Sequence, residues 1–187
     1  MKLTPQSIPD LLVIEPDVFG DARGFFFESW HQAKYAEAGL PRTFVQDNIS
    51  LSRRGTLRGL HAQNPRSQGK LVQVLDGEVF DVAVDIRRGS KTFGRWHGLS
   101  LSGENKLQFW IPPGFAHGFL VVSETALFHY KCTSHYSPAD EFTLLWNDPD
   151  VGIQWPEKSP KLSAKDENGL RLKQLPVERL TFKTLAS

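Results

Sequence analysis

The residues best suited to chemistry lie in the stretch Gly55-Thr56-Leu57-Arg58-Gly59-Leu60-His61-Ala62-Gln63, which runs on to Lys70 and Gly77. Its spacing matches a metal-binding β-barrel motif made of a glycine, a His-x-His pair, an acidic ligand and a closing glycine. Gln63 stands at the position of the second histidine, and Lys70 at that of the acidic ligand. An ammonium group has no lone pair and repels a cation. The stretch therefore predicts a site without a metal ion, whose histidine and lysine are suited to proton abstraction next to a carbonyl.

A second barrel motif, P-x-G-x-x-H, is matched by Pro112-Pro113-Gly114-Phe115-Ala116-His117-Gly118. In the metal-binding version this histidine is a further ligand, but here His117 would have at most His61 beside it. Two histidines next to a lysine form a poor cation site. A single histidine is more often structural than functional, whereas the spacing of the two motifs favours a functional role for both.

Composition limits the classes of function that remain. The chain has 187 residues with 40% hydrophobic and 23% charged residues, which is ordinary for one globular domain, expected over residues 1–187. A net charge of +1 gives no reason to expect nucleic acid or an acidic membrane surface as a partner. The single cysteine, Cys132, fits a reducing compartment, and neither a secretory signal nor a membrane-spanning apolar run is evident. We expect a cytoplasmic protein.

Short runs rich in β-branched and aromatic residues predict most of the chain to be β-strand. The expected strands cover residues 11–15, 25–30, 70–75, 78–86, 99–101, 107–111, 119–122, 126–132 and 142–146. Helices are expected only at 31–38 and 177–185, and residues 156–168 are expected to form a long loop. Asp76-Gly77 predicts a hairpin turn between two strands. This pattern is typical of an all-β sandwich or barrel.

Strand periodicity also predicts where side chains point. In 78–86, Asp81 and Asp85 alternate with apolar residues, which predicts a half-buried strand. His61 and Gln63 share a face, and Lys70 opens the next strand beside them. Strict alternation would turn Arg58 away from His61, so we expect a bulge at Gly59 or a position at the edge of the site.

The sequence resembles the dTDP-4-dehydrorhamnose 3,5-epimerase family of the cupin (jelly-roll) class from Glu15 to Asp166. The segments that carry the resemblance are Phe19–Ser29, Phe44–Asn48, Leu57–Gln63, Gln68–Val72, Gly77–Arg87, Trp110–Phe119, Tyr130-Lys131, Tyr136-Ser137-Pro138 and Leu162–Asp166. Their order and spacing make the match highly specific. Ala62 and His135 depart from the family pattern, which usually has aromatic residues at both positions.

The resemblance implies an all-β cupin jelly-roll barrel with few short peripheral helices. It also implies an isomerase that uses no metal and no cofactor and acts on a dTDP-linked 4-keto-6-deoxyhexose, inverting C3 and C5 beside the ketone. The family is dimeric with exchanged N-terminal strands, so we expect a homodimer.

Four residues match the family's catalytic positions, and their chemistry suits the reaction. His61 is the base, since histidine changes its charge near neutral pH. Lys70 can stabilise the enolate oxygen as charge develops there. The resemblance implies that Asp166 orients His61 and that Tyr130 is the acid on the opposite ring face. Taken alone, Tyr130 could equally be a core aromatic residue, and Asp166 a surface or helix-capping residue.

Substrate-contacting positions are also implied by the resemblance. They are Arg23, Glu28, Gln46, Asp47, Asn48, Arg58, Lys70, His117, Tyr136, Glu141 and Lys165. The guanidinium groups among them suit a diphosphate, which they bind bidentately. Glu28 is expected to reach the site from a second subunit.

Three other classes of protein compete with this interpretation. A 3-epimerase or 3,4-ketoisomerase of the same fold can retain the histidine base, although Tyr130 favours double inversion. A metal-dependent oxygenase would need ligands that Gln63 and Lys70 do not supply. A non-catalytic sugar-binding protein would not need a base, an orienting carboxylate and an opposite acid together.

Overall fold

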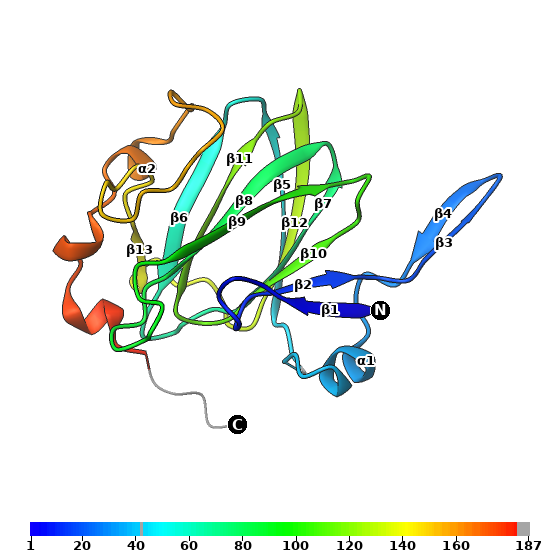
Figure 1. Ribbon diagram of the computed structural model, residues 1–187, viewed down its shortest axis with the longest axis horizontal. Helices are drawn as coiled ribbons and strands as arrows, with labels where there is room; N and C mark the ends of the chain where they lie inside the picture. Colours follow the sequence, from blue (N-terminus) through cyan, green and yellow to red (C-terminus); the bar gives the residue numbers. More distant parts are fainter. Residues whose placement is uncertain (42, 183–187) are drawn as a thin grey trace.

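The computed structural model describes residues 1–41 and 43–182 (Figure 1). Within them, two antiparallel sheets face each other and form a barrel. The six-stranded sheet has the order β1 (Lys2–Pro5), β2 (Leu12–Glu15), β10 (Gln108–Ile111), β7 (Lys70–Asp76), β12 (Thr125–Cys132) and β5 (Gln46–Arg53). The five-stranded sheet has the order β13 (Glu141–Thr143), β6 (Leu57–Gln63), β11 (Phe115–Val121), β8 (Glu78–Asp85) and β9 (Trp96–Ser102).

The remaining elements lie outside the barrel. Strands β3 (Val18–Asp21) and β4 (Gly24–Phe27) form a two-stranded arm that projects away from it (Figure 1). The helices are short: α1 (Gln32–Glu37), α2 (Ala164–Glu167) and the 3₁₀ helices η1 (Leu172–Gln174) and η2 (Val177–Leu180). These elements confirm the predicted all-β jelly-roll architecture with few peripheral helices.

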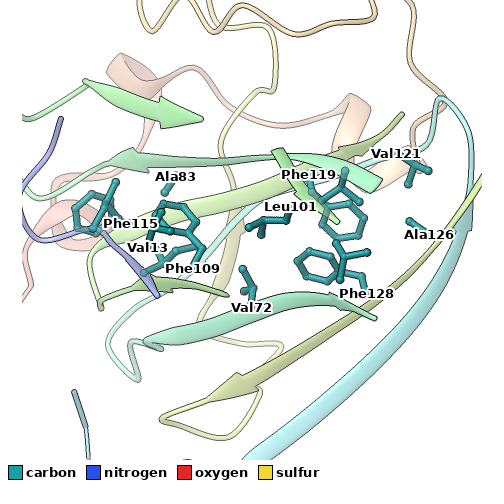
Figure 2. Packing of buried hydrophobic residues seen from close by; sticks show 14 of the residues in the cluster. Val13, Val72, Ala83, Leu101, Phe109, Phe115, Phe119, Val121, Ala126 and Phe128 are labelled. Carbon is teal, nitrogen blue, oxygen red and sulfur yellow. The ribbon is translucent and has the colours of Figure 1, made fainter. Parts of the chain in front are cut away.

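The main hydrophobic core lies between the two sheets, as Figure 2 shows. Phe119 and Phe128 stack at one end with their ring centroids 4.1 Å apart, and Phe109 and Phe115 lie at the other end. Side chains of both sheets alternate inward, so the interior of a jelly roll is filled by residues from facing strands. The aromatic stack forms one wall of the cavity described below.

Two smaller clusters cover parts of the outer faces of the sheets. On the five-stranded sheet, the C-terminal segment packs Leu172, Leu175 and Leu180 over the outward apolar residues of β8 and β11. On the six-stranded sheet, Tyr35 of α1 packs against Trp110.

The prediction of a hairpin at Asp76-Gly77 is wrong. Gly77 has the positive φ of 78° that a tight turn requires. However, β7 pairs with β10 and β12, whereas β8 pairs with β11 and β9, so the turn joins two different sheets. The turn residues therefore mark a corner of the barrel, where the chain passes from one sheet to the other, rather than a hairpin of two paired strands.

Strand β8 was predicted to be half-buried, and this is also wrong. Asp81 and Asp85 are both fully buried, as are Val82 and Val84, while Phe80 is partly buried. Asp85 accepts hydrogen bonds from Arg87, Ser90 and Thr92, while Asp81 is bound by a histidine of the barrel interior. Hydrogen-bond partners satisfy both carboxylates, which is how a strand with two charged residues can be covered on both faces.

The helix predictions are partly confirmed. The expected helix 31–38 corresponds to α1, whereas 177–185 contains only the one-turn η2 before residue 181, and residues 183–185 lie outside the described ranges. The loop expected at 156–168 contains α2 at its end. Helix α2 carries Asp166, a predicted site residue.

Candidate active site

A cavity of about 630 Å³ opens into the barrel between the two sheets. This size lies within the range of roughly 300–1,000 Å³ that small-molecule sites occupy. Among the residues that line it are Gln46, Asn48, Arg58, His61, Lys70, His117, Tyr130, Tyr136, Glu141, Lys165 and Asp166, all of which the sequence predicted. Strands of both sheets and the segment before α2 thus bring together residues from three parts of the chain.

An irregularity in β6 brings Arg58 into the cavity. The pairing of β6 with β11 shifts register between His61 and Arg58, as the bulge predicted at Gly59 requires. Gly59 has a φ of 117°, and a Cβ there would lie only 2.6 Å from the backbone of Gly118. Only glycine fits this crossing of two strands, and the shift lets Arg58 line the same cavity as His61.

His61 forms a short hydrogen bond with Asp166. The imidazole Nε2 lies 2.6 Å from Asp166 Oδ1, and the two side chains are 25% and 4% exposed. Because an ionised carboxylate only accepts hydrogen bonds, the Nε2 atom carries the proton and Nδ1 keeps its lone pair. The pair therefore fixes the tautomer that can take up a proton at Nδ1.

The segment that carries Asp166 is itself held in place. Lys161 exchanges backbone hydrogen bonds with Gly55 and Leu57, and the Ser163 hydroxyl donates to Asp166 Oδ2 at 2.8 Å. Burial raises the pKa of Asp166, but the hydrogen bond and charge of His61 and the Ser163 hydroxyl outweigh it and lower the pKa. Asp166 thus stays ionised and orients the imidazole.

Lys70 lies at the start of β7, where its Cα pairs with that of Cys132 on β12. Burial lowers the pKa of Lys70 below that of an exposed lysine, and it raises the pKa of the Cys132 thiol. An ammonium in such an environment interacts strongly with negative charge that develops nearby. Lys70 is thus suited to stabilise an oxyanion in the cavity.

Tyr130 shares the inward face of β12 with Phe128 and Cys132, as the alternation predicted. Its ring lies 6.0 Å from that of Phe128, at an angle of 51°. Burial raises the pKa of the phenol, so it keeps its proton in neutral solution. A protonated phenol at the wall of the cavity can donate a proton to a carbanion.

His117 forms a second histidine–carboxylate pair, which the sequence did not predict. Its Nε2 lies 2.9 and 3.0 Å from the two oxygens of Asp81. The side chains of His117 and Asp81 are 7% and 0% exposed, and burial lowers the pKa of His117. A charged residue on an alternating strand looks solvent-exposed in the sequence, so only the pairing of β8 with the neighbouring strand β11 reveals this pair.

A polar rim surrounds the mouth of the cavity. Glu141 Oε2 accepts hydrogen bonds from Lys165 Nζ at 2.9 Å and from the Tyr136 hydroxyl at 3.0 Å. Burial raises the pKa of Glu141, but the hydrogen bond from Lys165 and the neighbouring groups outweigh it and lower the pKa. The rim therefore combines a carboxylate, a cation and an aromatic face.

The residues at the ligand positions of the barrel motif do not fit a metal ion. The Gln63 side chain binds backbone groups of the segment around His135, with its oxygen accepting from Ser137 N at 2.9 Å. Lys70 offers no lone pair while it is protonated. Within residues 1–41 and 43–182, no group of three His, Cys, Asp or Glu side chains is arranged to hold a metal.

Three predicted residues do not line the cavity within one chain. Arg23 lies on the arm with its side chain 90% exposed, and Glu28 follows the arm and pairs with Lys34. Asp47 points to the outer face of β5, where it pairs with Lys131 at 2.6 Å.

Sequence reasoning also missed several residues of the cavity wall. They include Ser50, Thr56, Gln68, Phe119, Lys161 and Ser163. Most of them lie in or beside segments that match the family. Their position next to these motifs is the feature of the sequence that could have identified them.

Comparison with known proteins agrees with the fold. A family model described as dTDP-4-dehydrorhamnose 3,5-epimerase matches residues 5–174. Proteins of that name from Pseudomonas aeruginosa and Salmonella typhimurium are 58% and 59% identical to this chain, over 90% and 89% of it and 94% and 92% of their own lengths. A crystal structure of dTDP-6-deoxy-D-glucose-3,5-epimerase from Legionella pneumophila, in complex with dTDP-4-keto-L-rhamnose, superposes with a TM-score of 0.95 at 52% identity and covers 98% of this chain and 99% of that one.

Fold, cavity and relatives together define a carbohydrate epimerase, an enzyme of the isomerase class, built on a jelly-roll barrel. Within that class, the chain belongs to the dTDP-4-dehydrorhamnose 3,5-epimerase family. The helices of the described residues are all too short to cross a bilayer.

Proposed function

We propose that the chain converts dTDP-4-dehydro-6-deoxy-D-glucose into dTDP-4-dehydro-L-rhamnose by inverting C3 and C5, a step of dTDP-rhamnose biosynthesis. The observation that carries the proposal is that a single cavity is lined by His61, Lys70 and Tyr130, with His61 bound to a buried carboxylate. The names of the relatives at 58% and 59% identity support the same reaction. The proposed reaction uses no metal and no cofactor.

Proton removal begins at the carbon next to the C4 ketone. The C–H bond breaks, its proton goes to His61 Nδ1, and its electron pair moves toward the C4 oxygen to give an enolate. Asp166 stabilises the imidazolium that forms, because its carboxylate already accepts the Nε2 proton. Lys70 donates a hydrogen bond to the enolate oxygen, an interaction that strengthens as charge develops there.

Inversion requires the new proton to arrive on the opposite face of the ring. Tyr130 donates its phenolic proton to the carbanion, a new C–H bond forms, and the enolate pair returns to the ketone. Water then reprotonates the phenolate and takes the proton from His61. The same residues act at the second carbon after the ring shifts in the cavity.

Binding is assigned to the other predicted residues of the cavity. Arg58 and Lys165 supply positive charge for a diphosphate. The remaining contacts come from Gln46, Asn48, His117, Tyr136 and Glu141. Asp47 faces away from the cavity, so any contact it makes runs through its backbone.

Arg23 and Glu28 are proposed to act in the cavity of a second copy, as part of a homodimer. The arm that carries Arg23 projects from its own barrel (Figure 1), and it exposes Phe19 and Phe26 by 66% each. Exposed aromatic residues of this size are typical of interaction surfaces. A dimer that exchanges its arms would bury them and complete each cavity.

Complementation tests this assembly. Arg23→Ala and His61→Ala homodimers should each have little activity. When the two variants are unfolded together and refolded, a mixed dimer should contain one cavity with both native residues and regain activity. A mixture that stays as inactive as its components, or a monomeric mass in solution, would rule out the shared site.

The reaction itself is tested by incubating the chain with dTDP-4-keto-6-deoxyglucose in deuterated water and following the sugar by NMR. Deuterium at both C3 and C5, together with the L-rhamno configuration, is the expected result. Deuterium at C3 alone would indicate a 3-epimerase, and a migrated carbonyl would indicate a ketoisomerase. A bound sugar without any exchange would indicate a non-catalytic binding protein.

A further inference from the structure

Three glutamines converge on one backbone segment at the mouth of the cavity. Gln68 Nε2 donates to the carbonyl of Ser134 at 2.8 Å, and Gln63 Nε2 donates to that of His135 at 3.0 Å. The side-chain oxygen of Gln46 accepts from the next backbone amide, that of Tyr136, at 2.7 Å. Four consecutive residues, 134–137, are thus held by side chains, because Gln63 also accepts from the amide of Ser137.

Gln63 is the centre of this arrangement. It is 4% exposed, and its oxygen faces a backbone N–H while its nitrogen faces the carbonyls of Arg66 and His135. A backbone N–H only donates and a carbonyl only accepts, so the orientation of the amide is fixed by its neighbours. An ionised glutamate at this position could accept but could not donate.

The segment leads directly to the rim of the cavity. Tyr136 is half-exposed, and its hydroxyl donates to Glu141, whose Cα pairs with that of Gln63 across β13 and β6. Gln63 fixes the backbone on either side of Tyr136. It also lies opposite Glu141, which accepts the hydrogen bond from the Tyr136 hydroxyl. This arrangement fixes both ends of the Tyr136 side chain.

We propose that Gln46, Gln63 and Gln68 form a glutamine cradle, a set of positioning residues that fixes segment 134–137 and so sets Tyr136 at the wall where substrate binds. The cradle gives Gln63 a role at the position where the barrel motif would place a metal ligand. This proposal rests on the proposed function only for its kinetic readout. It predicts that the cradle acts on binding of the substrate rather than on proton transfer, because Tyr136 lies at the rim and His61 has its own orienting carboxylate.

The central test compares Gln63→Glu with the wild-type enzyme. The substitution keeps the shape of the side chain but replaces the donor with an oxygen that two carbonyls repel. KM for the dTDP-sugar should rise about tenfold or more, while kcat stays within about threefold. Amide hydrogen exchange at Tyr136 and Ser137, measured by NMR, should become faster.

The matched control is Gln73→Glu, a buried glutamine of the same barrel whose side chain bonds Gln108 and His129 outside the cavity. It should leave KM and the exchange at residues 136 and 137 unchanged. If Gln63→Glu does not fold, Gln68→Ala removes one bond of the cradle from a partly exposed position, and the same criteria decide.

An unchanged KM with unchanged amide exchange would overturn the proposal, and so would a fall in kcat at constant KM. A wild-type protein that lacks epimerase activity would contradict the proposed function instead. In that case amide exchange and the affinity for dTDP still test the cradle, since neither depends on turnover.

Discussion

Two histidine–carboxylate pairs lie side by side in this barrel and differ in what surrounds them. The Cα atoms of His61 and His117 pair across β6 and β11, and each ring uses Nε2 to bind an aspartate. The His61 side chain is 25% exposed, whereas that of His117 is 7% exposed. The same hydrogen bond therefore gives two different groups, one ring that is open to solvent protons and one that lines the same cavity but is largely enclosed.

The carboxylates differ in a corresponding way. Asp166 lies on a short helix outside the sheet and is held by Ser163, whereas Asp81 lies on β8, the strand next to β11, which carries His117. Burial lowers the pKa of His117, so this ring resists protonation. A histidine–aspartate pair is therefore not by itself a sign of catalysis. The imidazole must also be accessible to the substrate if it is to exchange protons with it.

The largest expected effect separates the two histidines. His61→Ala should reduce kcat/KM by about 10²–10⁴-fold, as expected when a general base is removed. Its effect on the urea midpoint should be small, because Asp166 keeps its bond to Ser163.

His117→Ala should show the opposite balance. It leaves the buried Asp81 without its partner and should lower the free energy of unfolding by about 3 kcal/mol, while proton exchange at C3 and C5 persists. Steady-state kinetics and urea unfolding of both variants measure the contrast. Equal effects on activity and stability at the two positions would mean that the pairs do not differ in role.

The next effect concerns the acid on the opposite face. Tyr130→Phe keeps the ring and its packing but deletes the phenolic proton, so proton removal should continue while correct reprotonation fails. Product inverted only at C3, or returned to the starting configuration, should increase. NMR of the product measures this directly. A Phe variant that makes the doubly inverted sugar at the wild-type rate would leave Tyr130 as a packing residue.

A smaller effect is expected on the pH profile. Burial lowers the pKa of Lys70, so this lysine loses its proton at a lower pH than an exposed one. Only the protonated form of Lys70 can stabilise the enolate. The kcat should therefore fall at alkaline pH, with a midpoint below the ordinary lysine pKa of about 10.4.

Lys70→Arg tests which group causes this limb. A guanidinium stays protonated, so the limb should move to higher pH even though the variant is slower overall. Tyr130 cannot replace Lys70 as the source, since burial raises the pKa of its phenol. If the alkaline limb of the pH profile does not move in Lys70→Arg, another group causes it.

The smallest expected effect is that of metal removal. Exhaustive chelation should leave activity unchanged, because Lys70 and Gln63 stand where metal ligands would be. Loss of activity that a divalent ion restores would contradict the account of the cavity.

Much of the fold and of the site could be predicted from the sequence. Strands with strong alternation, such as 126–132, were located correctly. Of the two positions predicted for Arg58, the structure has the one that depends on a bulge at Gly59 rather than one at the edge of the site. Helix α2 was missed because four residues are too few to show a helical period.

Other features depend on partners that are distant in sequence. Turn residues at Gly77 do not say which sheet the next strand joins, and the burial of Asp81 depends on His117 of the neighbouring strand in the same sheet. The role of Gln63 depends likewise on a segment more than seventy residues away along the chain, at Ser137.

In the proposed reaction one base, His61, serves both carbons. This claim is tested most directly by His61→Asn incubated with dTDP-4-keto-6-deoxyglucose in deuterated water, with C3 and C5 observed separately by NMR. Asparagine keeps a polar side chain in the cavity but cannot accept the proton. The account predicts that deuterium enters neither position at an appreciable rate, whereas the wild-type enzyme labels both. Continued exchange at either carbon in the variant would show that a second base exists and would contradict the account.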